Sequence, residues 1–257
     1  MRHCILRLFL ACIAIFSCQK SETQKPEEKI PGATVEPQST MAEAPSGSGG
    51  VLRGQVKYDG QPPAPQKLLV VKDAAVCGKI NHVDERLTVS GNGGIKNAVV
   101  YLSTITGGKS LTELGSAFVL DQQVCAYQPH VLIAPVNTPI QILNSDGVLH
   151  NIHSFSAKNP PINLAQPAFK KKMEISFSTP EAIAVKCDVH GWMSAWIFVV
   201  GHPYYALTDD EGRFVLTDIP AGTYTVHCWQ EILGEQTAQV TVGAGETVQT
   251  FRYASKP

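Results

Sequence analysis

Apolar and polar residues alternate in short runs along most of this chain. Residues 51–58 form one such run, which ends at Asp59 and Gly60, a pair that strongly favours a turn. Residues 97–103 form a second run of the same kind. Beyond residue 50, no segment repeats its apolar positions with the period of a helix, and Gly, Pro, Asn or Asp separate the runs. We therefore expect an all-β fold.

Further strand-like runs lie between residues 117 and 200 of the chain. They are residues 117–120, 130–134, 139–143, 172–177, 182–187 and 195–200. Their spacing favours a Greek-key β-sandwich. The loops after residues 143 and 187 are long enough to carry ligands, and residues 154–169, rich in Asn, Pro and Ala, are expected to be irregular.

The first residues have the layout of a secretory signal. Arg2 and Arg7 accompany an apolar run at residues 4–16 that is too short to span a bilayer, so we expect residues 1–17 to be a signal peptide. The run ends in the order Ile, Phe, Ser, Cys, which resembles the bacterial lipobox and implies a lipid on Cys18. An ordinary signal peptide cleaved nearby is the alternative.

Residues 18–50 consist mainly of Glu, Pro, Ser, Thr, Gly and Ala, which cannot bury enough apolar surface to fold. We expect a lipid-anchored flexible linker there. The protein is then exported, periplasmic or in the cell envelope, attached to the outer membrane through its N-terminal lipid only. Its 21 Lys and Arg residues against 22 Asp and Glu residues give no sign of nucleic-acid binding.

The cysteines need separate accounts. Three of the seven lie within residues 1–18, and four remain in the folded part. In an oxidising compartment Cys77 and Cys125 are the natural disulfide pair, which leaves Cys187 as a metal ligand and Cys228 as a buried thiol. Other pairings stay open, but a disulfide at Cys187 would leave the His and Met beside it without a purpose.

Residues 187–193 carry the most specific chemistry in the chain. Cys187, His190 and Met193 follow one another on a short stretch between two expected strands, and His150 follows another strand upstream. A thiolate with two imidazoles and a weak thioether is the donor set that selects copper and tunes it for one-electron transfer. The sequence thus predicts one type 1 copper site. His153 is the alternative to His150.

Residues 117–200 resemble the cupredoxins in the order of their motifs. The motifs include His150-Asn151 and the spacing Cys187-x2-His190-x2-Met193, which is similar to that of amicyanin and plastocyanin-like members. The resemblance implies a Greek-key sandwich in which His150, Cys187 and His190 are equatorial ligands and Met193 is axial. It also implies that Asn151 joins the two ligand loops and that the edge of His190 reaches the surface. Apolar packing from Trp192, Trp196 and Phe155 is expected around the copper.

The end of the chain carries a second pattern, T-D-x-x-G-x-F-x-L followed by I-P-x-G-x-Y-x-V. It resembles the carboxypeptidase regulatory-like, or transthyretin-like, β-sandwich and predicts such a domain over residues 202–257. Residues 51–108 resemble the opening of the same sandwich, in which case a cupredoxin domain at residues 109–201 is inserted in it. Alternatively, the strand at residues 97–103 belongs to the cupredoxin domain.

A copper-loaded electron carrier needs no catalytic residues, and we do not expect an enzyme. Multinuclear copper enzymes use closely spaced histidines, whereas none of the eight histidines here stands two positions from another. The expected partners are a redox protein that donates the electron and another that accepts it. A copper-handling module, such as a chaperone or buffer, and a structural surface β protein are the alternatives.

Overall fold

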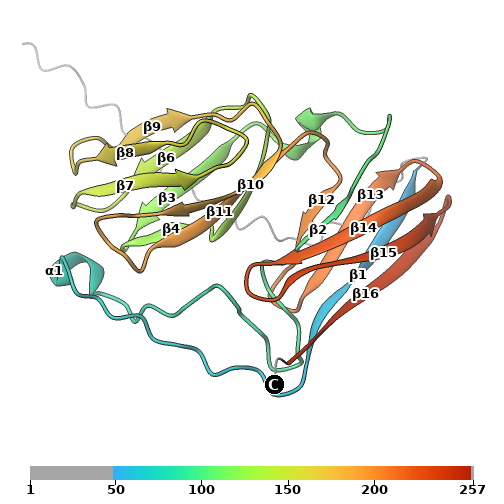
Figure 1. Ribbon diagram of the computed structural model, residues 1–257, viewed down its shortest axis with the longest axis horizontal. Helices are drawn as coiled ribbons and strands as arrows, with labels where there is room; N and C mark the ends of the chain where they lie inside the picture. Colours follow the sequence, from blue (N-terminus) through green and yellow to red (C-terminus); the bar gives the residue numbers. More distant parts are fainter. Residues whose placement is uncertain (1–48, 256–257) are drawn as a thin grey trace, which may run out of the picture. The chain divides into compact units, whose positions relative to one another are not determined.

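The computed structural model describes residues 49–255 of the protein (Figure 1). The expected signal peptide, Cys18 and nearly all of the expected linker lie outside these residues. The described part is built of sixteen strands in four sheets, which confirms the predicted all-β fold. Within residues 49–255, no helix has the length and apolar character needed to cross a membrane.

The sheets pair into two sandwiches. The first, the central sandwich, contains β3 (Phe118–Gln123), β4 (Ala126–Gln128), β5 (Val131–Pro135), β6 (Ile140–Asn144), β7 (His150–Phe155), β8 (Asn163–Gln166), β9 (Lys172–Ile175), β10 (Glu181–Lys186) and β11 (Ser194–Val200). Its sheets have the orders β5-β11-β10-β7-β8 and β4-β3-β6-β9. Alternate residues of both sheets, such as Ile142, Ile183 and Ile197, point inward and form one buried cluster.

The second sandwich, the terminal sandwich, contains β1 (Gly50–Asp59), β2 (Val99–Leu102), β12 (Tyr205–Leu207), β13 (Arg213–Ile219), β14 (Gly222–Gln230), β15 (Gly234–Val242) and β16 (Glu246–Ala254). β1 lies between β13 and β16, and β2 lies between β12 and β14. Both ends of the described chain therefore build this sandwich, and the central sandwich is inserted between β2 and β12 (Figure 1). Cys228 is fully buried in its core as a free thiol.

One strand lies where irregular chain was expected. β8 lies inside residues 154–169 and pairs with residues 150–153 of β7. Three of its four residues are exposed, so its apolar pattern could not reveal it. It holds its place through the hydrogen-bonded ladder rather than through a buried face.

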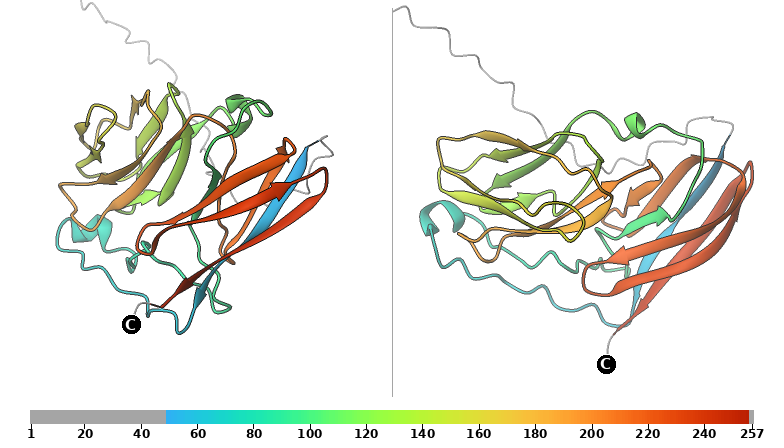
Figure 2. Two further views of the ribbon diagram at one scale, coloured as in Figure 1. Left: turned by 45° about the vertical axis from the view of Figure 1, so that its right-hand side comes forward. Right: turned by 45° about the horizontal axis from the view of Figure 1, so that its top comes forward.

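A long connection joins β1 to β2 and runs along the central sandwich (Figure 2). Residues 66–85 of this connection, here called the strap, double back on themselves through the short helix α1 (Ala74–Cys77). Bonds from Leu68 N to His82 O and from Asp84 N to Gln66 O, of 2.9 and 2.8 Å, join its two limbs. A disulfide between Cys77 and Cys125 links the strap to the turn between β3 and β4.

Candidate metal centre

Three buried side chains converge at one end of the central sandwich. His150 begins β7, Cys187 follows β10, and His190 lies on the turn before β11. The Nδ1 atoms of the two histidines lie 3.0 Å apart, and Cys187 Sγ lies 3.8 Å from His190 Nδ1. The exposed fraction of the three residues is 0, 2 and 0% in chain order. The structure therefore brings together the three residues that the sequence proposed as equatorial ligands.

The turn after β10 explains how Cys187 and His190 meet. The N–H of Met193 donates to the carbonyl of His190 at 2.9 Å, and the N–H of Cys187 donates to the carbonyl of Met193 at 3.3 Å. These two bonds close the turn and direct its side chains back toward the end of the strand. Met193 is 2% exposed and belongs to the same buried cluster as Cys187.

Each of the two histidines is bonded through its Nε2 atom to a carboxylate. Nε2 of His150 lies 2.9 Å from Oδ2 of Asp146, and Nε2 of His190 lies 2.9 Å from Oδ2 of Asp73. An ionised carboxylate can only accept a hydrogen bond, so the proton of each neutral ring is on Nε2. Both Nδ1 atoms then present a lone pair toward each other and toward the sulfur.

Such an arrangement calls for a cation. Two nitrogen lone pairs at 3.0 Å, with a sulfur beside them, repel one another unless a proton or a metal ion lies between them. One soft sulfur donor and two imidazoles suit copper. Carboxylates that hold the far nitrogens of metal-binding histidines are a common means of orienting such rings. The donor set thus fits the copper that the sequence predicts.

The pKa shifts of the three converging residues agree with metal binding. Burial by itself raises the pKa of the Cys187 thiol, but hydrogen bonds from His150 and from backbone N–H groups outweigh burial and hold this pKa below its usual range. Burial lowers the pKa of His150, but Asp146 and Cys187 together raise it above the usual value. The pKa of His190 is lowered by burial and by His150, against the effect of Asp73. The thiolate form, which binds metals, is therefore favoured.

Asp146 is itself fixed by the turn between β3 and β4. Val124 and Cys125 both adopt left-handed backbone conformations, with φ of 46° and 57°. Their N–H groups donate to the two carboxylate oxygens of Asp146 at 2.8 and 2.7 Å. These bonds, with that of His150, lower the pKa of Asp146 against the opposing effect of burial. The carboxylate that orients His150 is therefore itself immobilised.

Asn151 joins β7 to the ligand turn. Its Oδ1 accepts from the N–H of Asp188 at 2.6 Å, and its Nδ2 lies 3.1 Å from Oδ2 of the same residue. This is the role that the resemblance assigned to it. The bonds tie the strand that carries His150 to the residue that follows Cys187.

His153 lies outside the buried group. On a strand, residues 150 and 153 point to opposite faces, because side chains alternate. His153 accordingly turns outward, and its Nδ1 bonds Oδ1 of Asp188 at 3.0 Å. None of the candidate metal groups found among residues 49–255 includes His153.

The surroundings of the site differ from those expected. The Trp192 ring lies 5.1 Å from that of His190, and its Nε1 donates to the carbonyl of Cys125 at 3.0 Å. In contrast, Trp196 packs against Trp229, with 4.9 Å between ring centroids, and Phe155 is 50% exposed. The expected packing of Trp196 and Phe155 around the site is therefore wrong.

The expectation that the edge of His190 reaches the surface is also wrong. The residue is fully buried, and the strap lies over its Nε2 edge through Asp73. The long connection between β1 and β2, which the motifs of residues 117–200 do not include, supplies this cover. Asp146 could have been noticed from its place four residues before His150, but no sequence signal pointed to Asp73, which precedes His190 by 117 positions.

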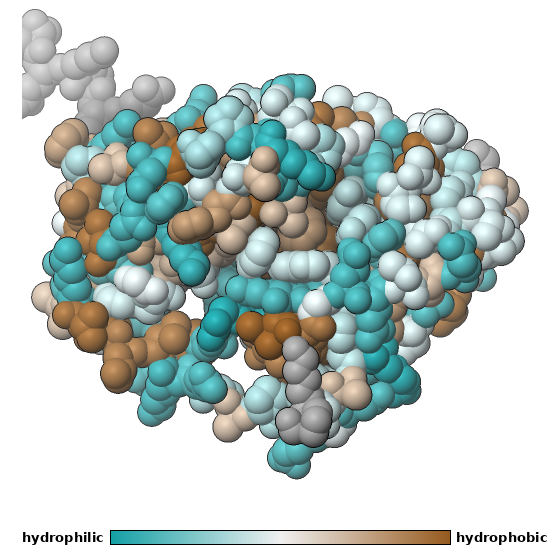
Figure 3. Space-filling model, viewed as in Figure 1, coloured by the Kyte–Doolittle hydropathy of each residue, from teal (hydrophilic) through white to brown (hydrophobic). Residues whose placement is uncertain are grey.

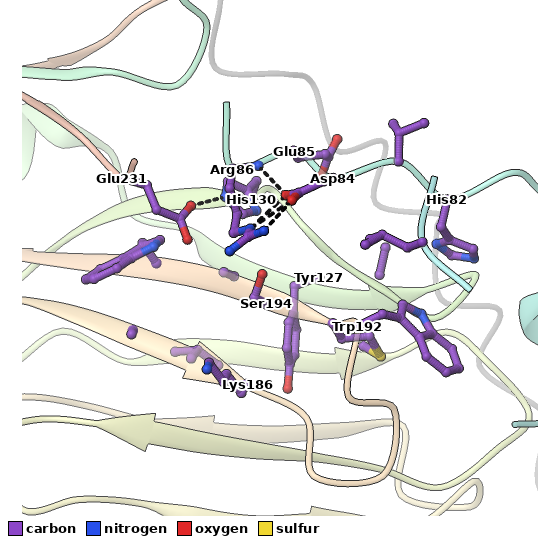
Figure 4. Close-up of a pocket in the computed structure, with 18 of the residues that line it drawn as sticks. His82, Asp84, Glu85, Arg86, Tyr127, His130, Lys186, Trp192, Ser194 and Glu231 are labelled. Atoms are coloured by element: carbon purple, nitrogen blue, oxygen red, sulfur yellow. Dashed lines mark hydrogen bonds and ion pairs between the residues drawn. The ribbon is translucent and has the colours of Figure 1, made fainter. Parts of the chain in front are cut away.

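A cavity of about 570 Å³ lies beside the ligand turn, between the strap and the central sandwich (Figure 4). Trp192 and Met193 line one side of it. Four of its polar side chains form two pairs: Arg86 donates to Asp84, and His130 Nε2 lies 2.8 Å from Glu231. We therefore assign the metal to the buried group rather than to this cavity.

Comparisons with solved structures find copper proteins at low overall similarity. A copper-containing nitrite reductase from Thermus scotoductus SA-01 is 20% identical, with a TM-score of 0.32 over 39% of this chain and 25% of its own. An oxidised amicyanin variant is 17% identical, with a TM-score of 0.30 over 39% of this chain and 98% of its own. A purple cupredoxin from Nitrosopumilus maritimus is 27% identical, with a TM-score of 0.25 over 29% of this chain and 81% of its own.

Sequence comparisons add little more. The family model of polysaccharide lyase family 4, domain II, matches residues 178–250. A search of the curated proteins returns no match. The resemblance of residues 202–257 to the carboxypeptidase regulatory-like sandwich stays a prediction. The case for a metal thus rests on the side chains of His150, Cys187 and His190 themselves.

Proposed function

We propose that the protein binds one type 1 copper ion and carries single electrons between a redox protein that donates them and another that accepts them. The residues that would hold the ion are His150 through Nδ1, Cys187 through Sγ and His190 through Nδ1, and Met193 would complete the donor set. The observation that carries the proposal is the convergence of two imidazole nitrogens and one sulfur in a buried site.

Copper supplies a reversible one-electron couple to such a donor set. The protein contributes rigidity: Asp146 and Asp73 fix the two rings, and Asn151 ties their supporting segments together. Ligands that cannot move between oxidation states keep the reorganisation energy of electron transfer low. Because the donor atoms are buried, no substrate has room to reach the metal, so we propose a carrier and not an enzyme.

A copper-handling module is the alternative, and the geometry favours it less. Release of copper requires the ligands to open, yet each ligand histidine is held by a second hydrogen bond and covered by protein. We further propose that the protein acts outside the cytoplasm, anchored by a lipid on Cys18. The disulfide between Cys77 and Cys125 supports an oxidising location.

The proposal is tested by loading the purified protein with Cu(II). We expect one copper per chain and an intense visible band from sulfur-to-copper charge transfer, which Cys187→Ser abolishes. The matched control is Cys228→Ser, which keeps the band; Cys228 lies in the terminal sandwich and is the second free cysteine among residues 49–255. A protein that binds no stoichiometric copper, or a Cys187→Ser variant that keeps the colour, would refute a type 1 site. Dissociation of copper within the time of a few redox cycles would favour a copper-handling module over an electron carrier.

A further inference from the structure

Asp73 occupies an unusual position at the start of α1. An aspartate that precedes a helix commonly uses its side chain to cap the first backbone N–H groups. The side chain of Asp73 makes no such bond, and its backbone is left-handed, with φ of 49°. The carboxylate is directed instead at Nε2 of His190, 2.9 Å away. A local capping bond is thus forgone in favour of a contact with a residue 117 positions distant.

The strap holds this carboxylate in place. Four residues after Asp73, Cys77 forms the disulfide with Cys125, whose carbonyl accepts from Trp192 on the ligand turn. Nε2 of His82, on the returning limb, lies 2.8 Å from the carbonyl of Cys77 and is buried. The segment that carries Asp73 is therefore connected to the turn that presents His190 through one disulfide and one hydrogen bond, and the bond of His82 holds the two limbs of the strap together.

The consequence for His190 is complete burial. Its Nε2–H has one acceptor, the carboxylate of Asp73, and its ring lies between the strap and Trp192. Without that acceptor the ring could turn or exchange its proton between Nδ1 and Nε2, because nothing else in the described structure bonds Nε2. The donor that faces Cys187 would then no longer be fixed.

We propose that Asp73 is a positioning residue of the metal centre, which keeps His190 in the Nε2–H tautomer with Nδ1 toward Cys187 and which, with the strap, closes the outer edge of the ring to solvent. The copper-dependent part of this inference rests on the proposed function; the contact with His190 does not. A carboxylate beside the ligand also favours the more highly charged Cu(II), so it lowers the reduction potential. The strap thereby covers the histidine edge through which an electron could otherwise pass directly to solvent-exposed partners.

Two variants separate the charge from the hydrogen bond. Asp73→Asn keeps an acceptor and tolerates the left-handed backbone, but removes the charge. Asp73→Gly removes the side chain, and glycine adopts φ of 49° at no steric cost, so the strap backbone is retained. The matched control is Glu85→Gln, which removes an exposed carboxylate on the same strap.

The first measurement uses metal-free full-length protein and ¹⁵N-labelled histidine. We expect the His190 Nε2–H to be visible by NMR and protected from exchange with solvent in the unaltered protein and in Glu85→Gln. In Asp73→Gly its exchange is at least about tenfold faster, and the Nδ1–H tautomer appears. Equal exchange in Asp73→Gly and Glu85→Gln would overturn the positioning role.

The second measurement uses the copper-loaded protein. Loss of a partner behind a metal-binding histidine typically lowers metal affinity about 10–100-fold. We expect a decrease of that size in Cu(II) affinity for Asp73→Gly, a smaller one for Asp73→Asn, a higher reduction potential in both, and no change in Glu85→Gln. An unchanged potential in both Asp73 variants would overturn the electrostatic role. If the unaltered protein binds no copper, the proposed function fails, while the NMR measurement still decides whether Asp73 positions His190.

Discussion

Removal of the disulfide between Cys77 and Cys125 should loosen the strap and weaken the whole central sandwich. The two cysteines are separated by 48 positions. In the chain-entropy model, closing a loop of this length destabilises the unfolded state by about 4 kcal/mol, between the values for loops of 15 and 100 residues. Measured losses are commonly smaller, so we expect the Cys77→Ala and Cys125→Ala double variant to lose about 2–4 kcal/mol. Alanine is chosen because both side chains are fully buried and serine would leave unpaired hydroxyls.

The assay is equilibrium unfolding in urea, followed by near-ultraviolet circular dichroism, with the free energy of unfolding extrapolated to water. The control is Cys228→Ala, which removes a fully buried thiol but no covalent link. A double variant that loses no more than twice the control's free energy would refute the reasoning, because truncation alone would then account for it. We further expect the double variant to expose the Nε2–H of His190 to exchange, because the strap carries Asp73.

Three further outcomes follow from the geometry of the central sandwich. His150→Ala should abolish stoichiometric copper binding while His153→Ala retains it, as metal analysis of the purified variants will show; retention by the first and loss in the second would reverse the assignment. Asn151→Ala should lower the free energy of unfolding by about 0.5–1.5 kcal/mol, because the N–H of Asp188 loses its acceptor, and an unchanged urea midpoint would contradict this. Burial raises the pKa of Glu181, but bonds from Ser156, from backbone N–H groups and from Asn159 outweigh it and lower the pKa to about 2. Its stabilising effect is thus present above the ordinary pKa of 4.5 and is lost as the pH falls through 2. Glu181→Gln should therefore destabilise the protein by about 1 kcal/mol at pH 7, allowing for solvent screening, and by almost nothing near pH 2; a loss that does not depend on pH would show that the carboxylate charge is not responsible.

Local patterns in the sequence determined most of the strands and half of the site. Alternation of apolar residues predicts strands such as β6 and β10, because one face of each is buried. Cys187, His190 and Met193 could be read together because one short turn carries them all. The choice of His150 over His153 rested on the resemblance, because alternation places the two side chains on opposite faces of a strand but does not say which face is buried.

Only the tertiary structure decided which other segments surround the candidate ligands and cover them. β8 could not be predicted, because its side chains are mostly exposed and its bonds to β7 are long-range. The distance of 3.0 Å between the Nδ1 atoms depends on the packing of β7 against β10. The contact of Asp73 with His190 joins residues 117 positions apart, through a strap without repeating pattern. Such contacts arise from chain topology and a disulfide rather than from local periodicity, which is why the burial of His190 is a property of the fold alone.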